Sequence, residues 1–526
     1  MSGGHDALRK GRHSEAPVAV PGPPTMSGGA PQDREFSFDI HDPDDRLHEE
    51  CGLFGVFTPD REDEMAASIA RVVYYGLYSQ QHRGQESAGI VVAGELGLEQ
   101  YRGMGLVAEV FSDQVLDRFS GRAAIGHVRY STAGSSTISN AQPLMAQSKL
   151  GQIAIGHNGN LVNAPVIRDL LEDAGVMFQT SSDSEVILNL VARSARHGLR
   201  RALQDALRAV QGAFSLVLLT EDSLIAVRDP KGIRPLVLGK LGDATVVASE
   251  SCALDAVGAD LVRDVEPGEI VIVTVDGLES LKLNERTQSQ VCSFEFVYFS
   301  RPDSEVDGVG VYASRMEAGR ILYREAPVDA DVVSGVPDSG VVAAHGYAEA
   351  AGISYAMTLI KNKYVGRSFI APTQELRERA VSVKLNALRH NVAGKRIVLI
   401  DDSIVRGTTM RKLVAMLRRA GATEVHIRIA SPPVRHACYF GMDYPSRNEL
   451  AGRRGVEEVR EMIGADSLAY LSLPGLHASL GDTGKYCVGC LTGVYPVAAP
   501  VGQEKDEIPE AIVQRDQLYT ESCCNT

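Results

Sequence analysis

The sequence lacks an apolar run that approaches the length of about 20 residues needed to cross a bilayer as a helix. Its first fifty residues also lack a continuous apolar core, which excludes a secretory signal peptide. Positive charge is scarce, because the formal net charge is -14 at pH 7, so a nucleic-acid partner is not expected. Any bound phosphate must be held by local groups. These absences predict a cytoplasmic protein without a membrane or nucleic-acid partner.

What is present indicates a soluble globular protein with more than one domain. A chain of 526 residues is too long for a single hydrophobic core. The hydrophobic content of 44% and the 51 glycines are typical of folded domains with many tight turns. In the cytosol, the eight cysteines suggest metal binding or catalysis sooner than disulfide bonds.

The first 287 residues contain two regions of different character. Residues 1–50 are rich in Gly, Pro, Ser, His and Asp, and we predict a disordered leader. The tetrapeptide MSGG occurs at both Met1 and Met26, which leaves the translation start open. Residues 51–287 alternate short apolar strands with turns, and helices are predicted at 64–80 and 184–211. Strands in blocks with a few helices predict a layered α+β domain.

The pattern changes after residue 288 to strands that alternate with helices. ADVVSGVP precedes a predicted helix at 341–351, and RIVLIDD precedes the helical segment MRKLVAMLRRAGA. Apolar strands that alternate with helices indicate an α/β domain with a parallel sheet, which we expect to span residues 288–500. Residues 501–526 form a polar tail.

RIVLIDDSIVRGTT, residues 396–409, is the most specific stretch of this second domain. A buried strand ends in Asp401 and Asp402, and a turn then opens a helix near Met410. Backbone N–H groups at such a helix start attract anions, and hydroxyl groups add donors. The acidic pair could accept hydrogen bonds from sugar hydroxyls and hold Mg²⁺. For a bare acidic pair, simple capping of the helix is the alternative.

The whole string resembles the 5-phosphoribosyl 1-pyrophosphate (PRPP) signature of type I phosphoribosyltransferases. The resemblance implies a pyrophosphate loop, for which SGVPDSG, residues 334–340, is suitably placed. It also implies one Mg²⁺ per subunit, held by Ser339, Asp401 and Asp402. The residues expected to bind PRPP in these two stretches are Asp338, Ser339, Asp401, Asp402, Ser403, Arg406, Gly407, Thr408 and Thr409.

A basic segment at residues 361–386, without clear strand character, lies between the two stretches. A run of charge is usually a solvated surface loop. In phosphoribosyltransferases this position carries a mobile lid that closes over PRPP. The resemblance therefore implies that basic and aromatic residues here meet the pyrophosphate, and the candidates are Lys361, Tyr364, Arg367 and Lys384.

Five glycine-rich motifs mark the first domain, and they begin with a cysteine. They are CGLFGVF at 51–57, QQHRGQESAG at 80–89, GHVRYSTAG at 126–134, GHNGNLVN at 156–163 and SSDSE at 181–185. In this order they resemble the glutaminase domain of the N-terminal nucleophile amidotransferases, whose fold is a four-layer αββα sandwich. The resemblance implies that the thiol of Cys51 attacks the side-chain amide of glutamine.

The chemistry explains why this cysteine must come first in the mature chain. Its thiol needs a base, and a free α-amino group with a pKa of about 7.7–8.0 can serve. While Cys51 is joined to Glu50, its nitrogen has no basic lone pair. We therefore expect an inactive precursor, and by analogy the leader is removed autocatalytically.

The same resemblance implies the other groups of the glutamine site. Asn158 and the N–H of Gly159 form an oxyanion hole for the tetrahedral intermediate. Arg129 binds the α-carboxylate of glutamine and Asp183 its α-ammonium group. Arg83, next to Gly84, helps to shape the pocket.

The close pair CVGC, Cys487 to Cys490, is typical of zinc or iron–sulfur ligation. Cys292 and Cys438 are the candidates for the remaining ligands, and their spacing leaves the two metals open. The similarity to clostridial and bacillary glutamine PRPP amidotransferases implies one [4Fe–4S] cluster per subunit, with a structural and redox-sensitive role. Cys252 is expected to be a small buried hydrophobe, and the terminal Cys523 and Cys524 receive no role.

The two domains together resemble the glutamine PRPP amidotransferase family. That resemblance implies that glutamine is hydrolysed to glutamate and ammonia. The ammonia then passes through an interdomain channel to C1 of PRPP, giving 5-phosphoribosylamine and pyrophosphate in the first committed step of purine synthesis. It also implies a homotetramer inhibited by purine nucleotides such as AMP and GMP. The alternative is a PRPP-fold regulator that binds nucleotides or RNA without catalysis, and the intact glutaminase motifs and acidic charge argue against it.

Overall fold

The computed structural model describes residues 51–60, 64–130, 137–284, 287–362, 385–442, 450–481 and 484–498. The predicted leader at 1–50 and the tail at 501–526 lie outside the described residues. Within the described ranges, no helix is both long enough and apolar enough to span a membrane.

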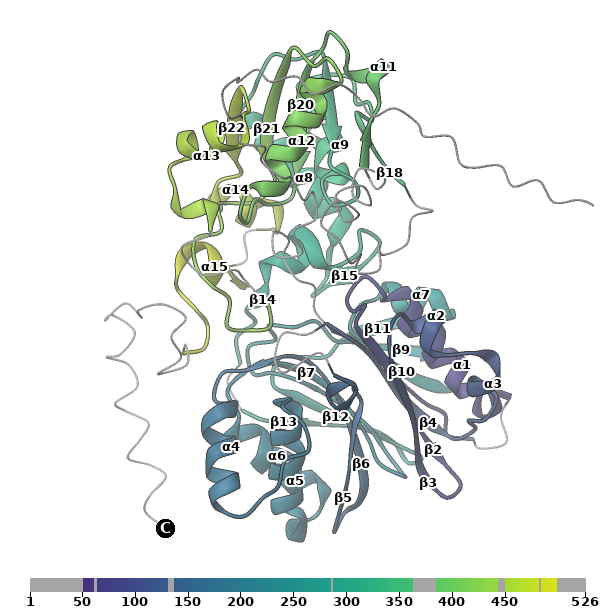
Figure 1. Ribbon diagram of the computed structural model, residues 1–526. Helices are drawn as coiled ribbons and strands as arrows, with labels where there is room; N and C mark the ends of the chain where they lie inside the picture. The colour runs from purple at the N-terminus through teal and green to yellow at the C-terminus, as the bar shows by residue number, and fades with distance from the viewer. Residues whose placement is uncertain are drawn as a thin grey trace, which may run out of the picture. The chain divides into compact units, whose positions relative to one another are not determined.

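The described residues from 51 to 284 form two antiparallel sheets (Figure 1). The first sheet has seven strands in the order β11 (Asp260–Asp264), β9 (Val237–Leu241), β10 (Ala244–Ala248), β1 (Gly52–Phe57), β4 (Ala123–Arg129), β2 (Ser87–Gly94) and β3 (Gly97–Met104). The second has six strands in the order β13 (Gly277–Lys282), β12 (Glu269–Thr274), β8 (Leu224–Arg228), β7 (Gly212–Leu219), β6 (Gly151–Leu161) and β5 (Leu144–Ser148).

Apolar side chains join these sheets face to face and attach helices to their outer faces. Leu53, Ile125 and Val217 belong to one buried cluster that draws on strands of both sheets. The first sheet is covered by α1 (Glu64–Ser79), α2 (Val107–Val110), α3 (Asp113–Leu116) and α7 (Cys252–Val257). The second is covered by α4 (Ala164–Asp173), α5 (Ser184–Arg193) and α6 (Leu199–Ala209). The predicted αββα sandwich is confirmed.

One predicted helix of this domain is wrong in its extent. Helix α1 agrees with the predicted 64–80, but the predicted helix at 184–211 is divided into α5 and α6. Between them lie a 3₁₀ turn at Ala195–His197 and Gly198, whose φ is 79°. Because glycine readily adopts positive φ and continues an α-helix poorly, the chain turns here. A second 3₁₀ turn lies at Ile138–Asn140.

The second domain is built on a parallel sheet, as predicted. Its strands follow the order β17 (Val332–Gly335), β20 (Arg396–Asp401), β21 (Glu424–Ile429) and β22 (Ser467–Tyr470). Apolar clusters cover both faces, one with α8 (Val311–Glu325), α9 (Val341–Ala351) and α14 (Leu473–Ser479), and the other with α12 (Thr408–Arg419) and α13 (Val456–Ile463). The carboxyl ends of the parallel strands therefore meet at one edge, where ligands of such sheets bind.

Short elements complete this domain. They are β14 (Val291–Cys292) paired with β23 (Tyr486–Cys487), β15 (Glu305–Val306) paired with β16 (Val309–Gly310), the π-helix η4 (Glu295–Phe299), α11 (Arg389–Val392), η6 (Ala451–Arg453) and α15 (Gly489–Thr492). Strands β18 (Leu359–Lys361) and β19 (Leu385–Ala387) pair antiparallel, with Lys361 opposite Leu385. Both ends of the segment 361–386 thus lie in strands, and the expectation of no strand character is wrong there. Burial of Leu359 and Leu385 in the core stabilises this strand pair.

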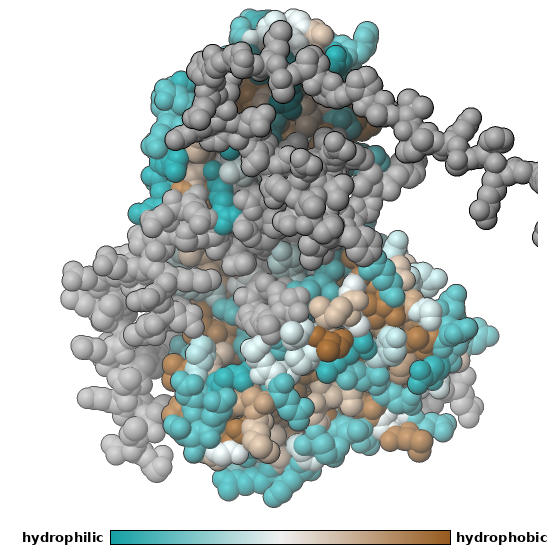
Figure 2. Space-filling model, viewed as in Figure 1, coloured by the Kyte–Doolittle hydropathy of each residue, from teal (hydrophilic) through white to brown (hydrophobic). Residues whose placement is uncertain are grey.

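Polar residues cover much of the visible face in the space-filling view, and hydrophobic residues form separate patches there (Figure 2). Most large apolar side chains instead lie in the clusters around the sheets.

Candidate active sites

Cys51 directly precedes β1, a buried strand held between β4 and β10. Its side chain is buried, and Sγ donates to the carbonyl oxygen of Tyr130 over 3.6 Å. Burial raises the pKa of the Cys51 thiol to about 11, against the lowering effects of that hydrogen bond and of Arg129. Because the thiolate is the nucleophile, a thiol with this pKa needs a base at neutral pH.

The predicted glutamine ligands lie around this thiol. Arg129, at the end of β4, is buried and pairs with Glu86 through Nη1 and Oε1, which are 2.6 Å apart. Asp183, at the start of α5, accepts a hydrogen bond from the N–H of Leu161 over 3.0 Å. The charges of Arg129, Glu86 and Asp183 all act on the thiol pKa, so the two predicted glutamine ligands, Arg129 and Asp183, lie near the predicted nucleophile.

Asp183 is held as a carboxylate by its surroundings. Burial alone would raise the pKa of Asp183, but the His157 imidazole and backbone donors lower it below its ordinary value. The Nδ1 atom of His157 lies 3.3 Å from Oδ1 of Asp183. An ionised carboxylate at this position suits a cationic amino group.

Strand β6 carries the predicted oxyanion-hole residues. Asn158 lies opposite Ser215 of β7 and is fully buried. Among the described residues, neither Oδ1 nor Nδ2 of Asn158 has a hydrogen-bond partner. Gly159 has a φ of 138°, and a Cβ there would lie 2.1 Å from the carbonyl oxygen of Ala213, so no larger residue fits. Because a buried amide without a partner costs free energy, Asn158 is poised for a ligand.

Arg83 supports the backbone of the nucleophile. Its Nε donates to the carbonyl oxygen of Cys51 over 3.2 Å. Its guanidinium is buried between two carboxylates, 2.5 Å from Oε1 of Glu250 and 2.8 Å from Oε1 of Glu295. Burial would lower the pKa of Arg83, but Glu295 and Glu250 raise it, so the cation is retained. The predicted glutamine-pocket arginine therefore has buried partners of its own.

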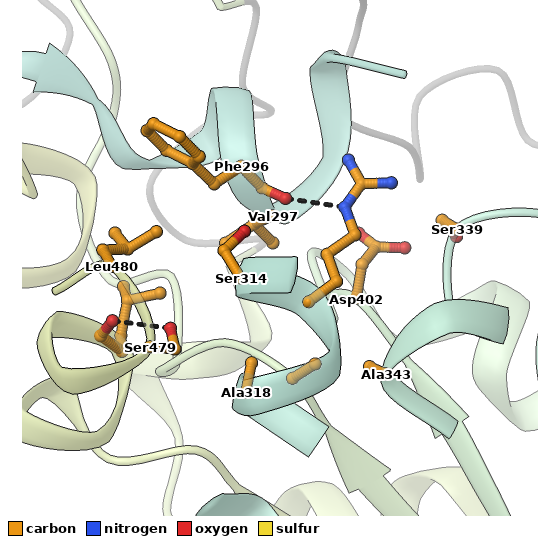
Figure 3. Close-up of a pocket in the computed structure, with 12 residues that line it drawn as sticks. Phe296, Val297, Ser314, Ala318, Ser339, Ala343, Asp402, Ser479 and Leu480 are labelled. Carbon is orange, nitrogen blue, oxygen red and sulfur yellow. Dashed lines mark hydrogen bonds between the residues drawn. The ribbon is translucent and has the colours of Figure 1, made fainter. Parts of the chain in front are cut away.

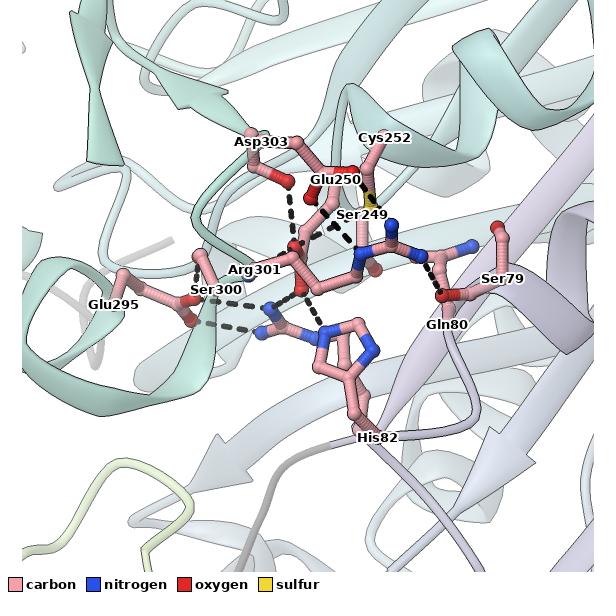
Figure 4. A network of polar contacts seen from close by, with 12 residues as sticks. Ser79, Gln80, His82, Ser249, Glu250, Cys252, Glu295, Ser300, Arg301 and Asp303 are labelled. Atoms are coloured by element: carbon pink, nitrogen blue, oxygen red, sulfur yellow. Dashed lines mark hydrogen bonds and ion pairs between the residues drawn. The ribbon is translucent and has the colours of Figure 1, made fainter. Parts of the chain in front are cut away.

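Glu250 lies at the centre of a polar network (Figure 4). Its carboxylate accepts hydrogen bonds from the backbone N–H of Arg301 over 2.9 Å and from the hydroxyl of Ser304 over 2.7 Å. Nε2 of His82 lies 2.8 Å from its Oε1. Burial would raise the pKa of Glu250, but His82 and Arg83 hold it well below its ordinary value. The network ties the first domain to the segment that opens the second.

The predicted PRPP-binding loops meet at the carboxyl edge of the parallel sheet. Asp401 ends β20 and Asp402 follows it, both largely buried, and the hydroxyl of Ser339 donates to Oδ1 of Asp401 over 3.4 Å. The hydroxyl of Ser403 donates to Oδ2 of Asp402 over 2.6 Å. Asp338 pairs with Lys361 across 2.9 Å. These contacts bring the loop with Asp338 and Ser339 next to the acidic pair.

Helix α12 begins at Thr408, two residues before the expected start near Met410. Gly407 precedes it with a φ of 86°, which places Thr408 and Thr409 in the first turn. A turn that contains Arg406 joins the acidic pair to the N-terminus of α12, where backbone N–H groups favour an anion. Of the predicted lid residues, Tyr364, Arg367 and Lys384 lie outside the described residues.

A pocket adjoins this edge and is lined by Asp402 and Ser339 together with largely apolar groups of η4, α8 and α14 (Figure 3). Arg315 of α8 also lines it, and Nε of Arg315 donates to the carbonyl oxygen of Phe296 over 2.6 Å. Burial lowers the pKa of Arg315 to about 10, which leaves it cationic at neutral pH.

The four predicted ligand cysteines lie in one apolar cluster. Cys292 and Cys487 are opposite each other in the parallel β14–β23 pair, and Cys490 and Cys438 belong to the same cluster. Burial, with smaller contributions from nearby Cys487 and Cys438, raises the pKa of the Cys292 thiol to about 12. In the part of the chain that the structure describes, however, no group of three or more Cys, His, Asp or Glu side chains is arranged to hold a metal ion.

Cys252 is buried as predicted, and its Sγ donates to Oε2 of Glu250 over 3.6 Å. It therefore belongs to the network of Glu250 and not to the cysteine cluster.

Comparison with proteins of known activity decides the family. The chain is 47% identical over 478 residues to the amidophosphoribosyltransferase of Bacillus subtilis (strain 168), an alignment that covers 89% of this chain and 98% of that protein. It is 49% identical over 460 residues to the amidophosphoribosyltransferase of Archaeoglobus fulgidus, covering 86% and 99%. The chain belongs to the amidophosphoribosyltransferase family.

Solved structures and domain families agree with the amidophosphoribosyltransferase assignment. The chain resembles the glutamine PRPP amidotransferase from B. subtilis complexed with ADP and GMP, with a TM-score of 0.80 and 46% identity over 88% of this chain and all of that one. A glutamine amidotransferase domain family matches residues 127–256, and a phosphoribosyl transferase domain family matches residues 314–432. The chain is thus a glutamine-dependent glycosyltransferase enzyme whose two domains fit the amination of PRPP in purine biosynthesis.

Several charged residues that support the amidophosphoribosyltransferase sites are not evident from the sequence. Glu86 lies within the QQHRGQESAG motif, but nothing in one sequence pairs it with Arg129. Glu295 could have been predicted, because it lies between two phenylalanines and a buried acid requires a partner. Arg315 lies on a helix with no motif of its own.

Proposed function

We propose that the first domain hydrolyses glutamine through Cys51 once the bond to Glu50 is cut. The free α-amino group of Cys51 takes the thiol proton, and sulfur attacks the side-chain amide carbon of glutamine. The C–N bond then breaks, and the proton leaves with the nitrogen as ammonia. Water next cleaves the γ-glutamyl thioester, releasing glutamate and regenerating the thiol.

Substrate binding and oxyanion stabilisation complete this half-reaction. Arg129 binds the α-carboxylate of glutamine, and Asp183, held by His157, binds its α-ammonium group. Asn158 Nδ2 and the N–H of Gly159 donate to the oxyanion. The observation that carries this proposal is the buried amide of Asn158, which has no partner among the described residues. Arg83 acts as a positioning residue on the Cys51 carbonyl.

The second domain binds PRPP at the carboxyl edge of its sheet. The first turn of α12, with Arg406, Gly407, Thr408 and Thr409, receives the 5-phosphate, while Asp401 and Asp402 bind the ribose hydroxyls. Asp338, Ser339 and Lys361, with Tyr364, Arg367 and Lys384, receive the pyrophosphate. Ammonia attacks C1 of PRPP, the C–O bond to pyrophosphate breaks, and positioning does most of the work.

Magnesium fits the oxygen donors present here, because Ser339, Asp401 and Asp402 offer the hydroxyl and carboxylate ligands that the ion prefers. One Mg²⁺ per subunit would neutralise charge on the departing pyrophosphate. Hydrogen bonds from Ser339 and Ser403 orient the carboxylates of Asp401 and Asp402.

The pocket beside Asp402 supports a route for ammonia between the sites. Its lining residue Phe296 follows Glu295, which pairs with Arg83, and Arg83 contacts the Cys51 carbonyl. A hydrogen bond, an ion pair and the Glu295–Phe296 peptide bond therefore link Cys51 to the wall of this pocket. The pocket lies at the carboxyl edge of the parallel sheet, where we propose that PRPP binds. A largely apolar wall would favour neutral ammonia over ammonium.

We further propose that Cys292, Cys438, Cys487 and Cys490 bind one [4Fe–4S] cluster per subunit. The buried thiols of Cys292, Cys487 and Cys490, with the partly buried Cys438 packed against the same apolar cluster, fit such a group by their chemistry. Bound there, the cluster would crosslink β14, β23 and the segment around Cys438.

The assembly and its boundaries complete the proposal. The domains are a propeptide at 1–50, a glutaminase domain at 51–287, a phosphoribosyltransferase domain at 288–500 and a tail at 501–526. The enzyme forms a homotetramer and is inhibited by purine nucleotides such as AMP and GMP. The structural relative with bound ADP and GMP supports this inhibition. A cytoplasmic location suits a thiol nucleophile and cysteine ligands, which need reducing conditions.

Glutamate release by the purified, processed protein tests the proposed function. Release should be slow with glutamine alone and increase when PRPP and Mg²⁺ are added, with pyrophosphate formed in equal amount. Release that does not respond to PRPP would contradict the coupling of the two domains.

A further inference from the structure

We propose that Asn160 and the segment Tyr439–Gly441 of the second domain position the oxyanion hole, which rests on the proposed roles of Asn158 and Gly159. We call Tyr439–Gly441 the strut. All of its residues lie within the described range 385–442.

The strut contacts the strand that bears the oxyanion hole. Nδ2 of Asn160, the residue after Gly159 on β6, donates to the carbonyl oxygen of Tyr439 over 2.9 Å. A Cβ built on Gly441 would lie 3.3 Å from both Cα and C of Gly159. The backbone of the strut therefore packs directly on the backbone of Gly159.

A buried arginine holds the other side of the strut. Arg234 is fully buried, and its Nε and Nη2 donate to the carbonyl oxygen of Phe440 over 3.1 and 2.5 Å. The carbonyl oxygen of Arg234 in turn accepts from the hydroxyl of Ser215 over 3.1 Å, and Ser215 lies opposite Asn158 on β7. Arg234 thus connects the strut to the strand beside the oxyanion hole.

Packing on the far side restricts the strut further. Phe440 is fully buried and meets the ring of Tyr495 edge-on, with ring centroids 5.9 Å apart. Tyr439 contacts the same ring at 5.1 Å. A segment held by two side-chain donors and two ring contacts resists displacement.

These contacts bear on catalysis because an oxyanion hole works only when its donors are already aimed at the developing charge. Gly159 has a φ of 138°, which few other residues would adopt, so its peptide orientation depends on neighbouring support. The strut supplies that support from another domain. Asn160 is therefore a positioning residue, and its loss should reduce the rate of the chemical step more than glutamine binding.

Asn160→Asp tests this inference, because aspartate keeps the shape but cannot donate to the Tyr439 carbonyl. We expect kcat for glutamine hydrolysis to fall about 10-fold or more, while KM for glutamine stays within about twofold. Synthesis from free ammonia and PRPP should be unchanged, because it bypasses the oxyanion hole. Gly441→Ala, whose Cβ would press on Arg234 and Gly159, should give the same pattern.

Asn163→Ala is the matched control. Asn163 has an amide that donates to the carbonyl oxygen of Ala209 over 3.0 Å, within the first domain and away from the strut. It should leave glutamine hydrolysis at the wild-type rate. Asn158→Ala separately tests the proposed function, since it should abolish glutamine hydrolysis whatever Asn160 does.

The inference is overturned if Asn160→Asp hydrolyses glutamine at the wild-type rate, if only KM rises, or if ammonia-dependent synthesis falls equally. If Asn158→Ala retains hydrolysis, the oxyanion assignment itself is wrong.

Discussion

The Nε of Arg83 lies 3.2 Å from the carbonyl oxygen of Cys51 and donates a hydrogen bond to it. The same guanidinium bridges Glu250 and Glu295, which are fully buried. The backbone of the nucleophile is therefore attached to a cation that the two domains share. A movement of the segment that contains Glu295 would therefore displace Arg83 and, through it, the backbone of Cys51.

Arg83→Lys should impair glutamine use selectively. One ammonium group cannot contact Cys51, Glu250 and Glu295 with the geometry of a guanidinium. We expect kcat/KM for glutamine to fall by about 100-fold, because a small misplacement of a nucleophile is costly. Steady-state assays with glutamine and with ammonia measure this, and equal losses in both would assign Arg83 to overall folding alone.

Glu250→Gln should weaken the fold at neutral pH. The folded-state pKa of Glu250 lies well below its ordinary 4.5, so its carboxylate contributes stability above pH 4.5. That contribution is lost as the pH falls through the folded-state pKa. Removing one charge from a buried pair costs about 3–5 kcal/mol.

Chemical denaturation at pH 7 and at decreasing pH checks this prediction. The difference in unfolding free energy between wild type and Glu250→Gln should be largest at pH 7 and shrink in acid. A difference that grows in acid would contradict the sign of the pKa shift. Glu279→Gln, at a largely exposed ion pair with Arg200, is the control and should change little.

The Cys51 thiol should react slowly while Glu50 remains attached. With a pKa of about 11, only about one thiol in a thousand is ionised at pH 8. Alkylation by iodoacetamide, followed by peptide mass spectrometry, should therefore accelerate about tenfold per pH unit up to about pH 11. Protein with a free Cys51 amino group should react faster at pH 8, and equal rates for both forms would refute the role of the amino group.

Asp402→Asn should separate the two half-reactions. Loss of a carboxylate at the PRPP edge should weaken Mg²⁺-dependent synthesis by about 10- to 100-fold with either nitrogen source. Basal glutamine hydrolysis without PRPP should persist. Asp329→Asn, at an exposed ion pair with Arg396, is the control. If Asp402→Asn makes product at the wild-type rate, the assignment of Asp402 to the PRPP site is wrong.

Cys438→Ser and Cys487→Ser should lose bound iron. Iron and acid-labile sulfide should approach four each per wild-type chain, as a [4Fe–4S] cluster requires. Cys252→Ser should keep that content, because Cys252 contacts Glu250 and lies outside the cluster. Stoichiometric zinc without sulfide in the wild-type protein would contradict the iron–sulfur assignment.

Much of the fold follows from local pattern. The apolar residues at 396–401 and the carboxylates at their end predict a strand that ends at the PRPP site. The strand β20 ends at Asp401, as expected. The break at Gly198 was missed because apolar periodicity continues through it. Strands β18 and β19 were not predicted because both are short. Each forms a strand only by pairing with the other, which is distant in the sequence.

Candidate site residues can be proposed from the sequence where one motif contains them, as for Cys51 and Asn158. They cannot be proposed where partners come from distant segments. Glu295 lies 212 positions from Arg83, and Tyr439 lies 279 positions from Asn160. Such pairs depend on how the domains pack, which a single sequence does not encode in any short motif.

The fate of the glutamine amide nitrogen tests the central claim most directly. Processed protein, which intact-mass analysis should show to begin at Cys51, is incubated with amide-¹⁵N glutamine, PRPP and Mg²⁺ in unlabelled ammonium buffer. The account predicts ¹⁵N-phosphoribosylamine and glutamate in equal amounts. Product that is entirely unlabelled, or active protein that still carries Glu50, would contradict it.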